Sequence, residues 1–70
     1  MTVTFRDYLM SRRVTDTPAG DFVGDAKSDK KFPDAQTWDE VETYLIMRGA
    51  DAHVRGIGKE VWNAYERQHR

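Results

Sequence analysis

The sequence predicts a small all-α domain of four or five short helices. Apolar side chains recur at three- and four-residue steps, which gather side chains on one face of a helix, and no segment shows the two-residue alternation of a strand. Large aromatic rings occur in nearly every segment of the 70 residues, as expected when a short chain builds one core. We therefore expect a single helical domain over residues 1–70.

The first helix is predicted over residues 4–12. Phe5, Tyr8 and Leu9 fall on one helical face. Thr4 is a suitable N-cap, because its hydroxyl can accept a hydrogen bond from a free amide of the first turn.

The second helix is predicted over residues 18–29. Thr17 followed by Pro18 is a start signal, because proline at the first helical position gives up an amide that has no partner there. Gly20 and Gly24 have a spacing that favours close approach of a second helix. Three carboxylates repeat at four-residue spacing, namely Asp21, Asp25 and Asp29. Since like charges at this spacing repel, we expect the row to be exposed and able to meet a basic partner.

The third helix is predicted over residues 37–48. Pro33 ends the preceding helix, and Thr37 with Glu40 fits a capping box, in which each side chain satisfies the other's backbone amide. Gly49 is a natural left-handed stop.

The last segment has helical apolar spacing from Val54 to Tyr65. Gly56 and Gly58 each weaken a helix by roughly 1 kcal/mol, so we expect a short turn at 51–55 and a helix at 57–68. The inward stripes of all these helices predict a shared core of Phe5, Leu9, Phe22, Phe32, Leu45, Val61, Trp62 and Tyr65.

The charges of the chain nearly balance, with 11 basic and 12 acidic residues. Residues 1–15 and 48–70 are each weakly basic and the middle is acidic, so the two termini would form a modest basic face if they meet. Arg6 and Asp7 interrupt the apolar stretch that a signal peptide needs, and no span of 18 apolar residues occurs. We expect a soluble cytoplasmic protein with no membrane partner.

Candidate chemistry is sparse. His53 and His69 are the two imidazoles, and without cysteine they lack the companions of a metal site. Ser11 and Ser28 lack a neighbouring base, no glycine-rich phosphate loop is present, and 70 residues leave little room for a substrate pocket. We predict no enzyme activity, no cofactor and no small-molecule substrate.

Four blocks of the sequence, in order, resemble the YozE-like family. They are Phe5-Arg-Asp-Tyr8-Leu9, Phe22 with Ala26, Asp29 and Phe32-Pro33, Tyr44-Leu45, and Val61-Trp62-Asn63-Ala64-Tyr65-Glu66. Residues 49–59 depart from the family pattern by being glycine-rich and shorter. The resemblance implies a sterile alpha motif-like fold, a small orthogonal helical bundle. Members generally lack an assigned activity, so it implies no catalytic residue.

Two functions follow as hypotheses. Small helical domains without pockets usually act through their surfaces, which favours a protein–protein interaction module with another protein as partner. The alternative is a small DNA-binding protein that reads DNA with its last helix, through Arg55, Lys59, Asn63 and Arg67. Against the alternative, Glu60 and Glu66 flank the same face and repel phosphates.

Overall fold

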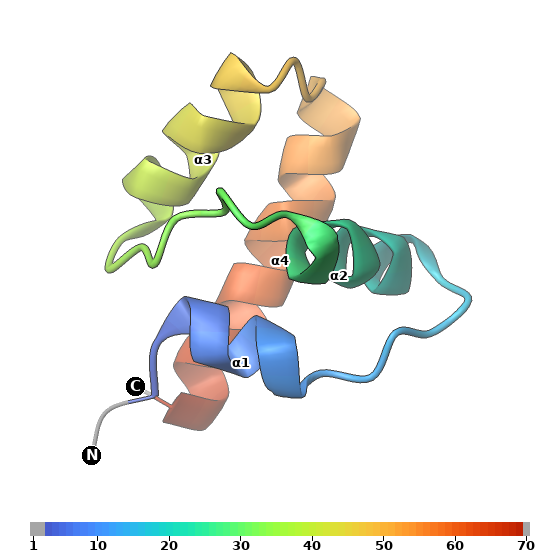
Figure 1. Cartoon of the computed structure of the whole chain (residues 1–70), viewed down its shortest axis with the longest axis vertical. Coiled ribbons are helices and arrows are strands. Elements are labelled where there is room, and N and C mark those ends of the chain that lie inside the picture. The colour runs from blue at the N-terminus through green and yellow to red at the C-terminus, as the bar shows by residue number, and fades with distance from the viewer. Residues whose placement is uncertain (1–2, 70) are drawn as a thin grey trace.

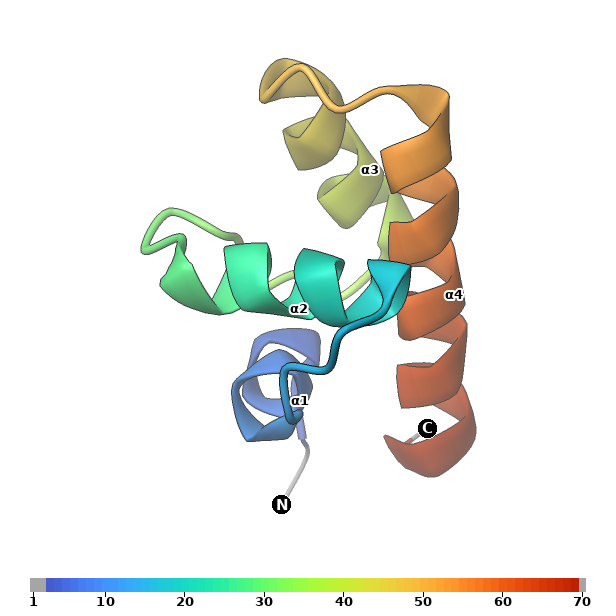
Figure 2. The same cartoon turned by 90° about the vertical axis from the view of Figure 1, so that its right-hand side faces the viewer.

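The computed structural model describes residues 3–69, and these form four helices. They are α1 (Phe5–Ser11), α2 (Pro18–Ser28), α3 (Trp38–Met47) and α4 (Ala52–His69). The long helix α4 contacts each of the other three, and α1 also packs on α2 (Figure 1). Figure 2 shows α2 lying crosswise to α4. The backbones of α2 and α3 do not approach each other, so these two helices meet α4 from separate directions.

A threonine begins each of the first three helices. Thr4, Thr17 and Thr37 have extended backbones, and their hydroxyls accept hydrogen bonds from amides three residues later, at 3.1, 2.9 and 3.3 Å. Each bond satisfies an amide that has no partner inside its helix. These local bonds explain why the starts of the first three helices lie within one residue of their predicted positions.

The capping box predicted at α3 forms only in half. The Glu40 amide donates to Thr37, but the Glu40 carboxylate accepts from the backbone of Gln36 (2.7 Å) rather than from that of Thr37. A complete box occurs instead at α1, where Asp7 bonds back to the Thr4 amide. The usual capping box has Glu or Gln at this position, so the shorter aspartate did not indicate the motif.

Gly49 ends α3 as the sequence predicts. Its φ of 84° lies in the left-handed region, where glycine has no Cβ to clash. The amide of Ala50 donates to the carbonyl of Leu45 (2.9 Å) and the amide of Gly49 to that of Ile46 (3.0 Å), the paired bonds of a Schellman ending.

The prediction for the last segment was wrong, because α4 runs unbroken through both glycines and no fifth helix forms among residues 3–69. Asp51 supports the start by accepting a hydrogen bond from the amide of Val54 (3.0 Å). Gly58 is buried where α4 meets α2, and a Cβ there would lie 3.0 Å from the ring of Phe22. The close packing that Gly58 permits offsets its low helix propensity.

One core joins all four helices, and all eight predicted core residues are buried in it. Phe5 lies at its centre, with ring centroids 4.8 Å from Trp62 and 5.4 Å from Tyr65. The Tyr65 hydroxyl donates to the carbonyl of Val3 (2.7 Å), so the beginning of the chain is held against the end of α4.

Gly20 and Gly24 face a loop rather than a second helix, which corrects the sequence interpretation. The nearest atoms to a Cβ at Gly20 belong to Thr15, and those at Gly24 belong to Val14. The connection between α1 and α2 therefore folds back over the small residues of α2. The glycine spacing correctly predicted that another segment lies close to α2. That segment is a loop and not a helix.

Candidate functional site

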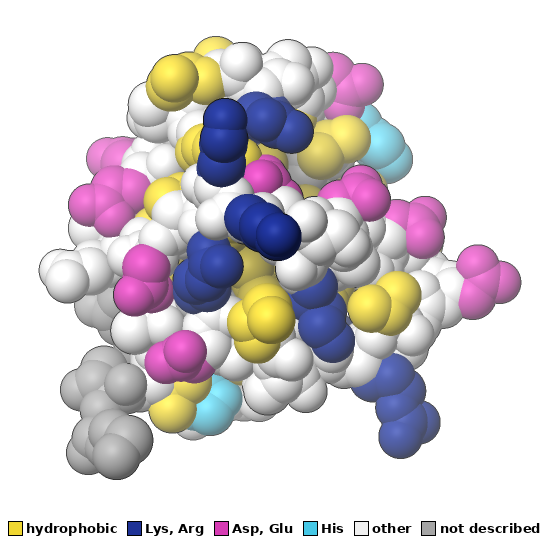
Figure 3. All heavy atoms as spheres, in the orientation of Figure 1, with side chains coloured by type: hydrophobic (Ala, Val, Ile, Leu, Met, Phe, Trp, Pro, Cys, Tyr) yellow, Lys and Arg dark blue, Asp and Glu magenta, His cyan; other side chains and the backbone are white. Residues whose placement is uncertain are grey.

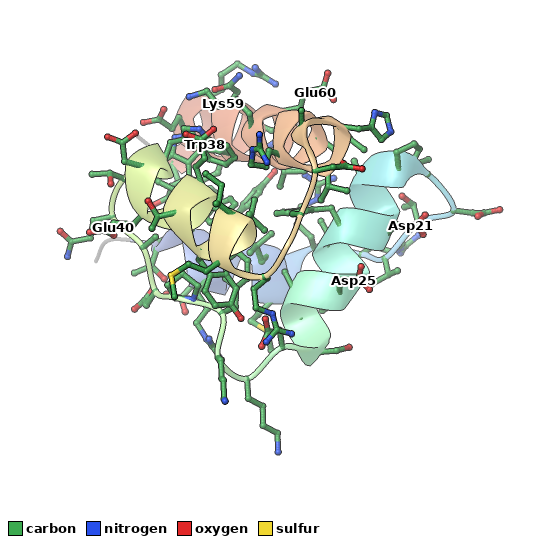
Figure 4. The ribbon with its side chains drawn as sticks, turned by 90° about the horizontal axis from the view of Figure 1, so that it is seen from above. Asp21, Asp25, Trp38, Glu40, Lys59 and Glu60 are labelled. Atoms are coloured by element: carbon green, nitrogen blue, oxygen red, sulfur yellow. The ribbon has the colours of Figure 1, made fainter. Side chains whose placement is uncertain are left out.

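An open groove of about 940 Å³ lies between α2 and the corner where α3 turns into α4. It exists because the backbones of α2 and α3 both approach α4 but not each other. Seen from above in Figure 4, Asp21 and Asp25 mark the α2 wall, with the α3–α4 connection across from them.

The floor of the groove is apolar and comes from three helices. Phe22 and Ala26 of α2, Leu45 of α3, and Val54 and Ile57 of α4 all line it. Val54 is 36% exposed, and Ile57 is half-buried against the core. Because Phe22, Ala26 and Leu45 are buried, the accessible apolar surface of the groove comes mainly from Val54 and Ile57.

The two ends of the groove carry opposite charge. Asp21 and Asp25 lie along α2, where both are exposed. Lys30 and Lys31 follow the end of α2, and Arg48 approaches them from the end of α3. An occupant that lies along α2 meets carboxylates first and cations afterwards.

Asp29 corrects the prediction of an exposed acidic row. It is half-buried, and its carboxylate accepts hydrogen bonds from the Tyr44 hydroxyl and from the Lys31 amide (3.0 Å). The Tyr44 bond is the main cause that lowers the pKa of Asp29, and the Lys31 amide adds to it. The same bond raises the pKa of Tyr44. Asp29 thus joins the α2–α3 loop to α3, and only Asp21 and Asp25 remain free to face a partner.

Tyr44→Phe is expected to reduce stability most at neutral pH. The lowered pKa of Asp29 gives stability that is present above its ordinary value of 3.8 and is lost as pH falls through the folded value. The raised pKa of Tyr44 gives stability that is present below 10.0 and is lost as pH rises through its folded value. Chemical denaturation at several pH values should therefore show parent and variant converging in acid and in alkali. The variant keeps the aromatic ring beside that of Phe32 (5.5 Å). If the difference in stability between parent and variant were the same at every pH, it would come from altered packing and not from the hydrogen bond.

Comparison with known protein families identifies the family of this fold. The family model described as YozE SAM-like fold matches residues 4–67. The chain belongs to the YozE SAM-like fold family. Membership establishes the fold but no activity, because the function of this family is uncharacterised. In the other two comparisons, no curated protein and no solved structure matched the chain significantly.

The last helix of this YozE SAM-like chain carries the residues predicted to contact DNA, and two of them have structural contacts. Arg55 is half-buried and donates to the carbonyl of Ala50 (2.7 Å). The Lys59 ammonium lies 5.3 Å from the centre of the Trp38 ring, and Figure 4 shows the two side chains together. Asn63 and Arg67 are exposed. The four residues follow one another along α4 as predicted. They do not form a free cationic face, because Arg55 and Lys59 are engaged in contacts within the fold.

Acidic side chains lie on the same helix as the residues predicted to contact DNA. Glu60 is exposed on α4, and Glu66 accepts a hydrogen bond from the indole nitrogen of Trp62 (2.9 Å). The opposing charge that the sequence indicates is therefore present on the same helix. Whether this face binds DNA stays a prediction.

The two histidines lie apart. His53 is exposed and lines the groove, whereas the ring of His69 lies 5.5 Å from that of Tyr8. Within residues 3–69, no three side chains of the metal-binding types are grouped to hold an ion. Over the same range, no helix has the length and apolar character needed to cross a bilayer.

Sequence reasoning missed the floor of the groove. Val54 and Ile57 were recognised as apolar positions, but the predicted break at Gly56 separated them into a turn and a helix. Val54 and Ile57 are three residues apart, so they share one face of a continuous helix. That spacing was the signal, but a continuous helix is expected only when the packing of Gly58 is known.

Proposed function

We propose that this protein is a non-enzymatic interaction module that holds a helical segment of a partner protein in the groove between α2 and the α3–α4 corner. The groove carries the proposal, because Val54 and Ile57 on its floor are partly exposed and the backbones of α2 and α3 stay apart on either side. An amphipathic helix placed in an apolar groove is a recurrent mode of protein recognition, with anchors at three- and four-residue steps.

The charges along the groove define the partner's chemistry. A segment that fits must present apolar anchors toward Leu45, Val54 and Ile57. Basic side chains beside Asp21 and Asp25, and acidic ones toward Lys30 and Lys31, then match the potential at each end. Such complementarity fixes the direction in which the segment lies.

The polar groups inside the groove support binding rather than chemistry. The two with clearly shifted pKa values, Asp29 and Tyr44, are bonded to each other. Their mutual bond occupies the carboxylate and the phenol, so they brace one wall of the groove. Ser28 is exposed on the rim.

A selection from a displayed library of amphipathic helices tests the proposal. Binders are expected to carry apolar anchors with basic residues toward one end, and amide shifts should concentrate on the groove. Val54→Gln should weaken the selected binder about fivefold, through loss of roughly 1 kcal/mol of apolar burial. Ile46→Gln is the matched control, because Ile46 is exposed and does not line the groove.

The charges are tested separately by neutralisation. Asp21→Asn with Asp25→Asn should weaken the same binder severalfold and reduce its association rate at low salt. Asp16→Asn with Asp34→Asn changes the net charge equally at exposed positions outside the groove lining. Equal losses in the two double variants, or amide shifts located away from the groove, would contradict the proposed function.

A further inference from the structure

A band of basic side chains crosses the face of the molecule seen in Figure 3. It draws on α1, α2, the α2–α3 loop and the end of α3. We define this basic band as Arg6, Arg12, Lys27, Lys30, Lys31 and Arg48. The band includes three lysines from the segment that the sequence marked as acidic, and it contains none of the cations of α4.

Contacts within the fold join the members of the basic band. Arg6 donates to the carbonyl of Phe32 (2.5 Å), which places its guanidinium beside the backbone that follows Lys31. Lys27 donates to the carbonyl of Arg12 (2.8 Å) and so connects α2 to the end of α1. Arg48 and Lys31 both act on the charge of Asp29, so they lie around one carboxylate. These contacts connect α1 both to α2 and to the α2–α3 loop, and they bring that loop close to the end of α3.

These contacts hold the cations without neutralising them. Arg6 and Lys27 bond to backbone carbonyls, and Arg12 bonds to the hydroxyl of Tyr8 (2.7 Å). Neutral acceptors leave the full positive charge in place. Asp29 is the carboxylate that lies among the cations, and it is occupied by Tyr44. The basic band is thus a preorganised array of positive charge on a chain whose net charge is −1.

We propose that the basic band binds the phosphate backbone of a nucleic acid duplex. A duplex carries about one charge per 1.7 Å of its axis, so a band that crosses a molecule of 33 × 26 × 22 Å meets several phosphates. Guanidinium groups held by one edge match phosphate oxygens with their remaining donors. Single strands require exposed rings for base stacking. Of the rings that touch the band, Tyr8 and Phe32 are buried, and Tyr44 is half-buried beneath Arg48 (5.9 Å) with its hydroxyl bonded to Asp29.

This surface is distinct from the α4 row and adds to the proposed function. The α4 row carries Glu60 and Glu66 beside its cations, whereas the carboxylate on which Lys31 and Arg48 act is Asp29, which bonds to Tyr44. Lys30, Lys31 and Arg48 also border the groove, so a bound helix and a bound duplex would meet there. Lys30 and Lys31 are exposed and Lys27 bonds on the other side of α2, which leaves most of the band clear of the groove floor.

Binding of a fluorescent 20-base-pair duplex of mixed sequence, followed by anisotropy from 50 to 200 mM salt, tests the proposal. Six phosphate contacts predict a log–log salt slope of about −5. Lys30→Gln with Lys31→Gln should weaken binding about tenfold or more at 50 mM salt and bring the slope nearer zero by about 2. Because both side chains are exposed, the thermal melting of this variant should match that of the parent.

Lys59→Gln with Arg67→Gln is the matched control, since it removes the same charge from α4. It should change duplex affinity less than threefold. A larger loss in this control than in the band variant would overturn the proposal and support DNA binding through α4. Absence of duplex binding at 50 mM salt would also overturn it.

Two further probes separate other anionic partners. Vesicles rich in phosphatidylserine and a poly-glutamate peptide should bind more weakly than the duplex. If either binds as tightly, and with the same dependence on Lys30 and Lys31, the duplex assignment is wrong. Val54→Gln should leave duplex affinity unchanged, so failure of the helix-binding function and failure of the basic band are distinguishable.

Discussion

Trp62→Ala is expected to lower the free energy of unfolding by roughly 3–5 kcal/mol, which is most of the stability of so small a domain. Trp62 is 2% exposed, and its ring lies 4.8 Å from Phe5, 5.2 Å from Tyr65 and 6.4 Å from Trp38. Removing the indole leaves a cavity at the place where α1, α3 and α4 share their rings. It also removes the hydrogen bond to Glu66.

Urea denaturation followed by circular dichroism measures this loss. Met47→Ala is the control, because Met47 is 79% exposed and its truncation should change stability by less than about 0.5 kcal/mol. Trp62→Phe should fall between the two, since it keeps a ring in the core but leaves part of the cavity. A Trp62→Ala variant that unfolds at the parent's urea concentration would show that the aromatic core is not what holds the helices together.

Gly20→Ala is expected to cost roughly 1–3 kcal/mol, although alanine is the better helix former. A Cβ at this position would overlap the carbonyl oxygen of Thr15, a backbone atom that cannot turn aside. The Gly20 amide also donates to the Thr17 hydroxyl that caps α2 (2.9 Å). The α1–α2 connection must therefore shift, and the cap of α2 is strained with it.

Gly56→Ala provides the opposite expectation on the same chemical change. Gly56 is exposed inside α4 with no atom within 4 Å of the added Cβ, so this variant should gain roughly 0.5–1 kcal/mol from helix propensity. Thermal unfolding of the two variants beside the parent decides the matter. A stabilised Gly20→Ala variant would mean that the loop does not press on α2 in solution.

The basic band shows how charge counted along a sequence differs from charge arranged in space. Residues 16–47 sum to a negative charge, yet Lys27 bonds to the backbone of Arg12, and Arg6 bonds to the backbone of Phe32, next to Lys31. The two ends of the described chain do meet, at the bond from Tyr65 to Val3, and the basic face expected there stays a prediction beside the basic band. Segment sums average over helical faces, and the faces decide which charges a partner meets.

The sequence determined the features whose causes are local. Thr17 and Thr37 fix helix starts through bonds that span three residues, and Gly49 ends α3 because glycine tolerates positive φ. The core residues could also be predicted from the sequence, because helical spacing alone places their side chains on one face of each helix.

Tertiary structure alone decided the rest. From the sequence, Gly58 is expected to break the helix, but in the structure it makes room for Phe22. In the same way Asp29 is expected to be an exposed charge, but it accepts a hydrogen bond from Tyr44. The groove is the same kind of feature, since it lies where the backbones of α2 and α3 approach α4 but not each other. Such features depend on distances between residues far apart in the chain, and local propensities contain no information about those distances.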